Sequence, residues 1–310
     1  MSNQYVLHLL IIAFVYSVVA LGVRVVMITG QWTFGQAAFL GIGAYSCELL
    51  RTHFGLSFWI SMPLAGVFAA LFALTIGYPI LRPKGIYFSM LTLCLGEVIR
   101  TIALEWRSIT GGASGMTSIA PPNELSFGPL LSVKFGPTDK IPYYYLALFL
   151  LLVTLLVMHR IDKTRLGRSL RSIRQSDSLA AGIGINVARY KVIAFAIGSF
   201  FSGISGAFMP TYLGTVYPDH FNVWQSIYAV VHVTVGGLEH LFGPVVGTLF
   251  VTFIFEITRA SPELQQLLYA LILIVVIMLL PKGLTSLASQ SLVWSAYIKR
   301  HLGGKNFGTA

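Results

Sequence analysis

The stretch IPYYYLALFLLLVTLLVMH, residues 141–159, decides the fold class of this chain. It contains no Asp, Glu, Lys or Arg, and a helix needs about 20 mainly apolar residues to cross a bilayer. A second run of the same kind, LQQLLYALILIVVIMLLP, occupies residues 264–281. Backbone polar groups cannot stay unpaired in lipid, so several such runs predict a helical bundle rather than a barrel. We therefore expect an all-α, polytopic membrane protein.

Outward from this run, hydropathy and turn signals divide residues 1–310 into one transmembrane domain with about nine crossings. Charged residues supply 10% of the chain, against roughly a quarter in a soluble domain. The first crossing has no Lys or Arg ahead of it and no small-x-small cleavage site, so we expect a retained span rather than a signal peptide. The predicted crossings are residues 5–29, 34–50, 57–80, 86–106, 142–159, 192–212, 223–238, 241–258 and 264–280.

The distribution of Lys and Arg predicts the orientation of these crossings. If the loop at about 160–191 is cytoplasmic, fifteen of the 21 Lys and Arg fall on the inner side and five outside. This asymmetry is the positive-inside bias, and it accounts for the net charge of +10 without a nucleic-acid partner. The scheme places the amino terminus outside and the tail at about 281–310 in the cytoplasm. The external loop, at about 108–141, is too long and irregular for a turn, which favours a docking or gating role.

The sequence predicts no catalytic, cofactor-binding or metal site. The two cysteines, Cys47 and Cys94, both lie in apolar segments, where neither a disulfide framework nor a zinc site is expected. The chain lacks the G-x(4)-G-K-[ST] phosphate loop, the H-E-x-x-H motif and the G-x-S-x-G elbow. A transporter that uses ATP would therefore need an ATPase on another chain.

Two glycine-rich stretches interrupt the apolar sequence, TGQWTFGQAAFLGIGAY at 29–45 and GGLEHLFGPVVGTLF at 236–250. In each, a Phe-Gly pair precedes a short apolar segment, and paired interrupted segments are typical of internal repeats around a transport path. One pair of short matches is also what chance produces. Between them, small residues recur every four positions from Ala194 to Gly206, which predicts close helix packing or a moving contact. The candidate path or gate residues here are Gly35, Gln36, Phe39, Gly41, Gly43, Gly236, Gly237 and Gly243.

Ionisable residues inside the crossings are also candidates, because an ionised group at mid-bilayer costs roughly 2.5 to 3.5 kcal/mol. Glu97 and Arg100 are three residues apart on one helix face, so they can form an ion pair that closes a helix contact or take a substrate or proton role. His232 lies deep in its crossing, either neutral and hydrogen-bonded or part of a proton relay. Glu48 and Glu256, near outer span ends, are expected to reach water.

The basic stretch RLGRSLRSIRQSDSLAAGIGINVARYK, residues 165–191, contains an amphipathic pattern. Leu166, Leu170 and Ile173 form one apolar stripe, and arginines recur every three residues beside it. Helix formers extend to the Ala pair before GIGIN, which predicts one short cytoplasmic helix over about 166–181. It could be a topology anchor, lie flat on anionic lipid, or fit a groove in a soluble partner.

The string GRSLRSIRQSDSLAAGIGINVARYKVIAFAIGSFFSGISGAF resembles the coupling loop and following span of the branched-chain amino acid ABC transporter permeases of the LivM type. The segments TFGQAAFLGIGAY, LRPKGIYFSMLTLCLGEVIR, TGGASGM, FGPVVG and LPKGL resemble further motifs of that family, so the resemblance covers nearly the whole chain. It departs from the family at Arg24, where an uncharged polar residue is usual, at Glu239 and His240, and at Gln175. Gate chemistry or substrate could differ there.

The resemblance implies an inner-membrane, multi-pass permease subunit without its own ATPase. Its partners would be a second homologous permease, two cytoplasmic ATPase subunits that use ATP and Mg, an extracytoplasmic substrate-binding protein and membrane lipid. The substrate would be a branched-chain or related amino acid; importers of urea, amides and other small polar solutes share this type. An ion-coupled secondary transporter using Glu97, Arg100 or His232 is the alternative from another class. The residues carried over for ATPase coupling are Gly167, Arg168, Leu170, Arg171, Ile173, Arg174, Asp177, Ala180, Ala181 and Gly184.

Overall fold

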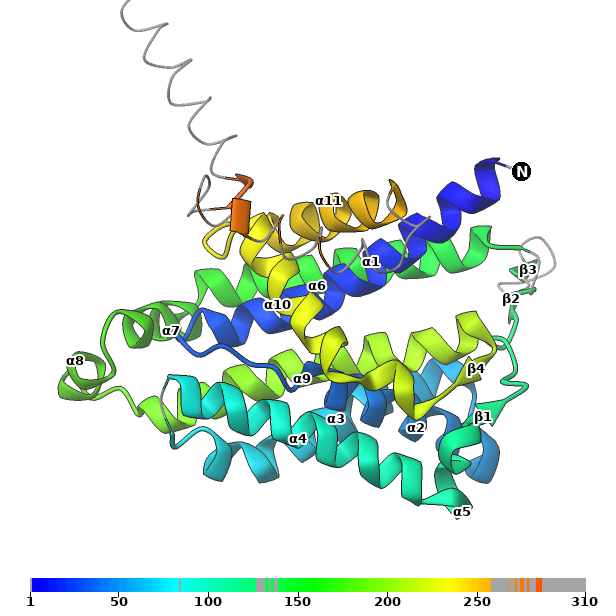
Figure 1. Ribbon diagram of the computed structural model, residues 1–310, viewed down its shortest axis with the longest axis horizontal. Helices are drawn as coiled ribbons and strands as arrows, with labels where there is room; N and C mark the ends of the chain where they lie inside the picture. Colours follow the sequence, from blue (N-terminus) through cyan, green and yellow to red (C-terminus); the bar gives the residue numbers. More distant parts are fainter. Residues whose placement is uncertain are drawn as a thin grey trace, which may run out of the picture.

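The computed structural model is an elongated helical bundle, with helices α7 and α8 at one end and the short strands β1 to β4 toward the other (Figure 1). The structure describes residues 2–83, 85–126, 132–133, 135–136 and 139–257, together with 267, 271, 274, 275, 278 and 283–285. The predicted ninth crossing at 264–280 and the predicted tail at 281–310 lie largely outside these residues.

Long helices make up most of the described chain. They are α1 (Ser2–Met27), α2 (Gln36–Phe54), α3 (Phe58–Ile80), α4 (Ile86–Glu105), α6 (Ile141–Lys163) and α9 (Val187–Leu213). Shorter helices are α5 (Arg107–Thr110), α7 (Arg165–Gln175), α8 (Asp177–Gly182), α10 (Val223–Gly236) and α11 (Gly243–Ile257), with 3-10 turns η1 (Gly112–Ser114) and η2 (Pro218–Phe221). Four two-residue strands complete it: β1 (Met116–Thr117), β2 (Leu125–Ser126), β3 (Ser132–Val133) and β4 (Thr215–Val216).

Helix α9 forms the centre of the bundle, because its small residues let three other helices approach its backbone. A Cβ on Gly22 of α1 would stand 2.7 Å from the carbonyl oxygen of Gly198, and one on Gly43 of α2 would overlap the backbone of Gly203. A Cβ on Gly203 would in turn stand 2.7 Å from that of Ala69 in α3. The predicted small-residue face of residues 194–206 is thus confirmed as a packing surface for α1, α2 and α3.

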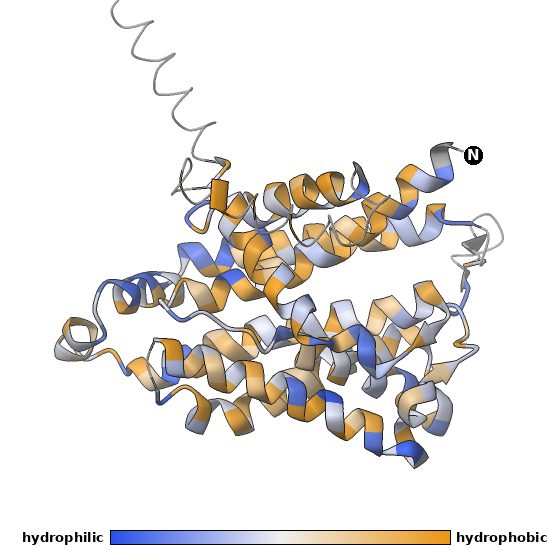
Figure 2. Cartoon of the chain, viewed as in Figure 1, coloured by the Kyte–Doolittle hydropathy of each residue, from blue (hydrophilic) through white to orange (hydrophobic). Residues whose placement is uncertain are grey.

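Within the residues that the structure describes, five helices are long and apolar enough to span a membrane: α1, α3, α4, α6 and α9. The all-α polytopic fold is therefore confirmed, and hydrophobic residues predominate along the long helices (Figure 2). Nine crossings are not confirmed. Helix α10 has 14 residues, which at 1.5 Å per residue is about 21 Å, short of a hydrocarbon core of about 30 Å. Of α11 the structure describes residues Gly243–Ile257.

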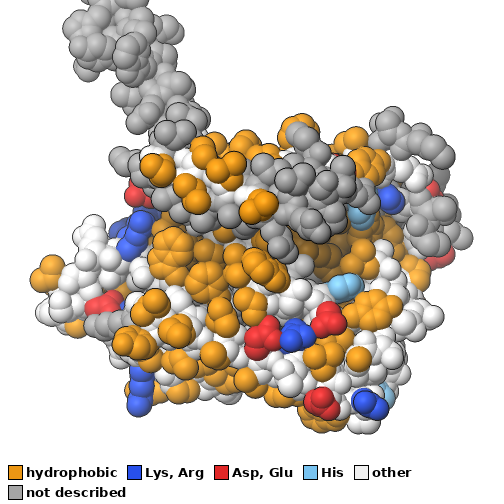
Figure 3. All heavy atoms as spheres, viewed as in Figure 1, with side chains coloured by type: hydrophobic (Ala, Val, Ile, Leu, Met, Phe, Trp, Pro, Cys, Tyr) orange, Lys and Arg blue, Asp and Glu red, His pale blue; other side chains and the backbone are white. Residues whose placement is uncertain are grey.

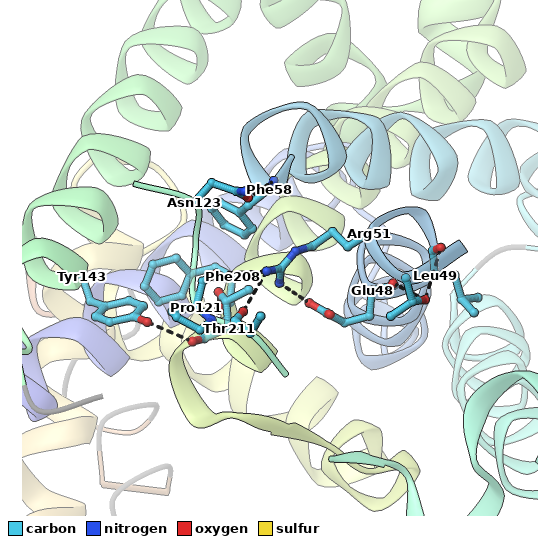
Figure 4. A network of polar contacts seen from close by, with 11 residues as sticks. Glu48, Leu49, Arg51, Phe58, Pro121, Asn123, Tyr143, Phe208 and Thr211 are labelled. Carbon is cyan, nitrogen blue, oxygen red and sulfur yellow. Dashed lines mark hydrogen bonds and ion pairs between the residues drawn. The ribbon is translucent and has the colours of Figure 1, made fainter. Parts of the chain in front are cut away.

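The segment predicted as an external loop is tied to the ends of the spanning helices rather than projecting freely. Strand β1 pairs with β4 in antiparallel fashion, Met116 opposite Val216. Arg51 donates hydrogen bonds to the carbonyls of Ala120 (2.8 Å) and Pro121 (3.0 Å) and pairs with Glu48 at 2.9 Å (Figure 4).

Asn123 holds the start of α3 in the same region, because its Oδ1 accepts from the Phe58 amide at 3.0 Å (Figure 4). The Glu48 side chain is 3% exposed, so the expectation that it reaches water was wrong. Arg51, at 2.9 Å, neutralises the Glu48 carboxylate where water was expected to solvate it.

Candidate functional site

The basic segment forms two helices rather than the one predicted, because Ser176 breaks it. Ser176 has extended backbone angles (φ −164°, ψ 121°), and its side-chain oxygen accepts from the Leu179 amide at 3.3 Å. A serine N-cap of this kind starts a new helix. Helix α7 therefore ends at Gln175, and α8 begins at Asp177 in a different direction at one end of the molecule (Figure 1).

The apolar stripe of α7 faces the bundle. Leu170 and Ile173 are 1% and 2% exposed, and Leu170 joins a cluster that includes Leu21 of α1 and Met158 of α6. A Cβ on Gly167 would stand 2.5 Å from the carbonyl oxygen of Ile161, so only glycine allows α7 to fold back so tightly on α6. The apolar stripe predicted from the sequence is confirmed as one helix face. This face is buried against the chain's own helices, so it is not free to contact lipid or a partner.

The outward surface of the segment is basic, with an apolar tip. Arg168, Arg171 and Arg174 are exposed on α7. In α8, Ala180 is buried while Leu179 and, just after the helix, Ile183 are each 74% exposed. Sequence reasoning missed this pair, although their spacing of four residues on a short polar helix was a readable signal.

The remaining residues carried over for coupling connect the tip to α9. Asp177 forms an ion pair of 2.8 Å with Lys191, whose side chain is 6% exposed. Ala181 and Gly184 are exposed, and Gly184 has φ +85°, a left-handed conformation that favours glycine after the helix. The segment is therefore fixed at both ends, by Gly167 against α6 and by Asp177 against α9.

A buried arginine links α7 to the connection between α10 and α11. Arg24 of α1 is 1% exposed, and its Nη2 lies 3.0 Å from Oδ2 of Asp162 at the end of α6. Oδ1 of the same carboxylate lies 3.6 Å from Nη2 of Arg171. Arg24 also donates to the carbonyls of Leu238 (3.0 Å) and Glu239 (3.4 Å). The Asp162 carboxylate thus pairs with both the buried Arg24 and the exposed Arg171.

The two glycine-rich interruptions each lead into a helix, and the internal repeat that their Phe-Gly pairs indicate stays a prediction. Gly35 precedes α2, and Gly243 begins α11. In the second interruption, a Cβ on Gly236 would overlap the backbone of Gly243, and one on Gly243 would overlap Gly237, whose φ is +108°. Helices α10 and α11 consequently touch through their backbones at this turn.

In the first interruption, the candidate path residues pack against α9 and η2. Gln36 is fully buried and its Oε1 accepts from the Ser202 hydroxyl at 2.7 Å. The Phe39 ring lies edge-on to Phe195 at 5.1 Å between centroids. A Cβ on Gly41 would meet the Phe221 ring at 3.2 Å. Their role in a path or gate stays a prediction.

Glu97 and Arg100 form the ion pair predicted from their spacing, at 2.9 Å. Arg100 also contacts Asp219 of η2 at 2.8 Å, a partner 119 residues away that sequence spacing did not indicate. These three side chains are 26% to 75% exposed. His232 is 4% exposed, and its Nδ1 has no hydrogen-bond partner among the residues that the structure describes.

Long apolar helices, backbone-tight glycine contacts and a basic segment folded back on the bundle define a multi-pass membrane transport subunit. A family model described as branched-chain amino acid transport system / permease component matches residues 5–277. The chain belongs to this family of inner-membrane permeases, and the resemblance to the LivM type is confirmed.

Several curated relatives agree with this assignment. The permease protein LivM of a high-affinity branched-chain amino acid transport system in Salmonella typhimurium is 30% identical over 294 residues, covering 90% of this chain and 69% of that protein. The LivM protein of Escherichia coli K12 is 29% identical with the same coverage. A probable branched-chain amino acid permease LivH of Methanocaldococcus jannaschii is 26% identical over 76% of this chain and 75% of its own length. No solved structure gives a significant match.

Proposed function

We propose that the chain is a transmembrane subunit of an ATP-driven ABC importer for branched-chain or related amino acids. A second homologous permease would complete the pathway, two cytoplasmic ATPases using ATP and Mg would supply the energy, and an extracytoplasmic binding protein would deliver substrate. The amino terminus would lie outside and the basic segment in the cytoplasm, in keeping with the excess of Lys and Arg on that side.

The observation that carries this proposal is that α7 buries its apolar face in the bundle and exposes its basic face. A topology anchor needs only charge, and a helix lying on lipid would turn its apolar stripe toward the membrane. Here Leu170 and Ile173 are locked into the bundle, while Arg171 and Arg174 face outward beside the exposed Leu179. Such a surface fits a soluble partner, and its rigid attachment allows the partner's movement to reach the helices as a rigid-body displacement.

The residues proposed for ATPase coupling divide by position in the structure. Arg168, Arg171 and Arg174 would contact the ATPase directly. The others would hold the segment in shape, and they are Gly167, Leu170, Ile173, Asp177, Ala180, Ala181 and Gly184.

Reconstitution of the chain with its partner subunits in proteoliposomes tests the proposal. We expect uptake of L-leucine that requires ATP and the binding protein, and its loss when Arg171→Glu and Arg174→Glu reverse the basic surface. Arg189→Glu, at an exposed position at the start of α9, is the matched control and should keep uptake. Uptake by the chain alone, driven by a proton or sodium gradient, would contradict the ABC assignment. Normal substrate-stimulated ATP hydrolysis in the Arg171→Glu, Arg174→Glu complex would contradict the coupling role.

A further inference from the structure

A cavity of about 490 Å³ lies between α1, α10 and α11, at the end of the bundle opposite to the basic segment. A second cavity of about 210 Å³ adjoins it beside the end of α9 and η2, and Ile12, Tyr16 and Gln225 line both. Figure 3 shows the surface hollowed on this face, beside histidine side chains. The larger volume falls in the range of roughly 300 to 1,000 Å³ that is typical of small-molecule sites.

The cavity walls come from α1, α10 and α11, and in α1 and α10 lining residues share one helix face. Leu9, Ile12 and Tyr16 follow one another at i, i+3 and i+7 along α1. Gln225 and His232 stand seven residues apart on α10, so they too share a face. Two of the four α1 residues that line the cavity, Leu9 and Ile12, are aliphatic and suit a branched hydrocarbon side chain.

Two polar atoms in this cavity lack partners although they are buried. Nδ1 of His232 and Oε1 of Gln225 form no hydrogen bond within the part of the chain that the structure describes. A buried polar atom left unsatisfied costs about 1 to 3 kcal/mol, so each is expected to have a partner in the working protein. An amide oxygen can only accept a hydrogen bond, and a neutral imidazole nitrogen accepts when the proton is on the other nitrogen.

The two unsatisfied atoms favour a ligand that carries hydrogen-bond donors. An ammonium group has only donors, so it could donate to both Gln225 Oε1 and His232 Nδ1. A ligand that offered only a carboxylate would bring no donor to these two acceptors.

We propose that this cavity binds an apolar amino acid in transit, with the α-ammonium group donating to Gln225 Oε1 and His232 Nδ1 and the aliphatic side chain against Leu9 and Ile12. The carboxylate faces the open side of the cavity. This inference rests on the proposed function, because it assigns the substrate a site within the permease subunit itself. None of the path candidates from the interrupted segments lines this cavity.

Protection of an introduced cysteine tests the site directly. The assembled complex, in nanodiscs, carries Leu9→Cys with the native cysteines replaced (Cys47→Ala, Cys94→Ser) and is labelled with a small methanethiosulfonate. We expect L-leucine at about ten times its dissociation constant to slow labelling about tenfold. 3-Methylbutylamine, which keeps the ammonium group and the branched chain, should also protect, and 4-methylpentanoate, which lacks the ammonium group, should not. Phe54→Cys, 74% exposed at the end of α2, should react at the same rate with and without these ligands.

Substitutions in the cavity provide the second measurement. The double variant Gln225→Leu, His232→Phe should lose protection by L-leucine at Leu9→Cys. Thr234→Val on the same helix, whose hydroxyl bonds only the carbonyl of Val230, should keep it. Persisting protection in the double variant, or equal protection by 4-methylpentanoate, would overturn the proposal.

The same nanodiscs separate failure of this site from failure of the proposed function. A complex that hydrolyses ATP in response to loaded binding protein but shows no protection by L-leucine refutes the cavity alone. A wild-type complex with neither ATP-driven uptake nor stimulated hydrolysis refutes the importer assignment on which the site depends.

Discussion

Replacing Asp162 by asparagine isolates the energetic role of the carboxylate shared by Arg24 and Arg171. The substitution keeps the shape of the side chain and leaves the buried Arg24 guanidinium, 2% exposed, without a countercharge. Removing one partner from a buried ion pair costs about 3 to 5 kcal/mol. Because the asparagine oxygen can still accept a hydrogen bond from Arg24, we expect the free energy of unfolding to fall by about 3 kcal/mol, the lower end of that range.

The converse substitution should cost less. Arg24→Met removes the buried charge and fills most of its volume, and Asp162 keeps Arg171 at 3.6 Å and a 15% exposed position. What is lost is mainly the pair of hydrogen bonds to the carbonyls of Leu238 and Glu239, for which about 1 to 2 kcal/mol is expected. The double variant Arg24→Met, Asp162→Asn should be more stable than Asp162→Asn alone, so the coupling energy should exceed the cost of Arg24→Met and reach about 2 to 3 kcal/mol.

Unfolding of the purified chain by SDS in mixed micelles, followed by tryptophan fluorescence, measures all three free energies. Arg189→Met, an exposed arginine on α9, is the matched control and should change stability by less than about 0.5 kcal/mol. The reasoning is refuted if Asp162→Asn is no more destabilising than Arg24→Met, or if the double variant equals the sum of the singles.

Three further substitutions test other contacts. Gly43→Ala places a Cβ against the backbone of α9, so the free energy of unfolding should fall by about 1 to 3 kcal/mol. Gly182→Ala is the control: its Cβ would have nothing within 4 Å, so the unfolding midpoint should stay unchanged. Ser176→Ala removes the N-cap of α8 and should destabilise that helix by about 1 kcal/mol, visible as faster hydrogen exchange at the Leu179 amide; an unchanged rate would contradict the cap. Asp219→Asn should cost under about 1 kcal/mol in a thermal shift assay, because Asp219 is 75% exposed and its partner arginine keeps a second carboxylate; a larger loss would show that this pair is buried in the assembly.

The parts of the fold that follow from local periodicity could be predicted from the sequence. Leu170 and Ile173 fall on one face because a helix repeats every 3.6 residues, and Glu97 meets Arg100 for the same reason. The break at Ser176 was missed, because Ser176 follows a helix-forming run and its capping bond depends on where α8 points. The small residues of α9 indicated close packing, but not which helices would use it.

Long-range contacts were beyond the reach of sequence reasoning. Arg24 stands 138 residues from Asp162, and no spacing rule joins them. Glu48 appeared to sit at a wet span end, yet its side chain is 3% exposed and pairs with Arg51, which donates to the carbonyls of Ala120 and Pro121. The close turn between α10 and α11 depends on the backbone contact between Gly236 and Gly243, which hydropathy does not report.

The exposed apolar side chains of Leu179 and Ile183 bear on how quickly an unassembled subunit is degraded in the cell. Each side chain is 74% exposed in the isolated subunit, and apolar groups left in water promote non-specific association and recognition by chaperones and proteases. If the proposed ATPase covers this tip, a subunit made in excess of that ATPase would be the one most readily degraded. The tip would in this way match the amount of permease that survives to the amount of partner available to cover it.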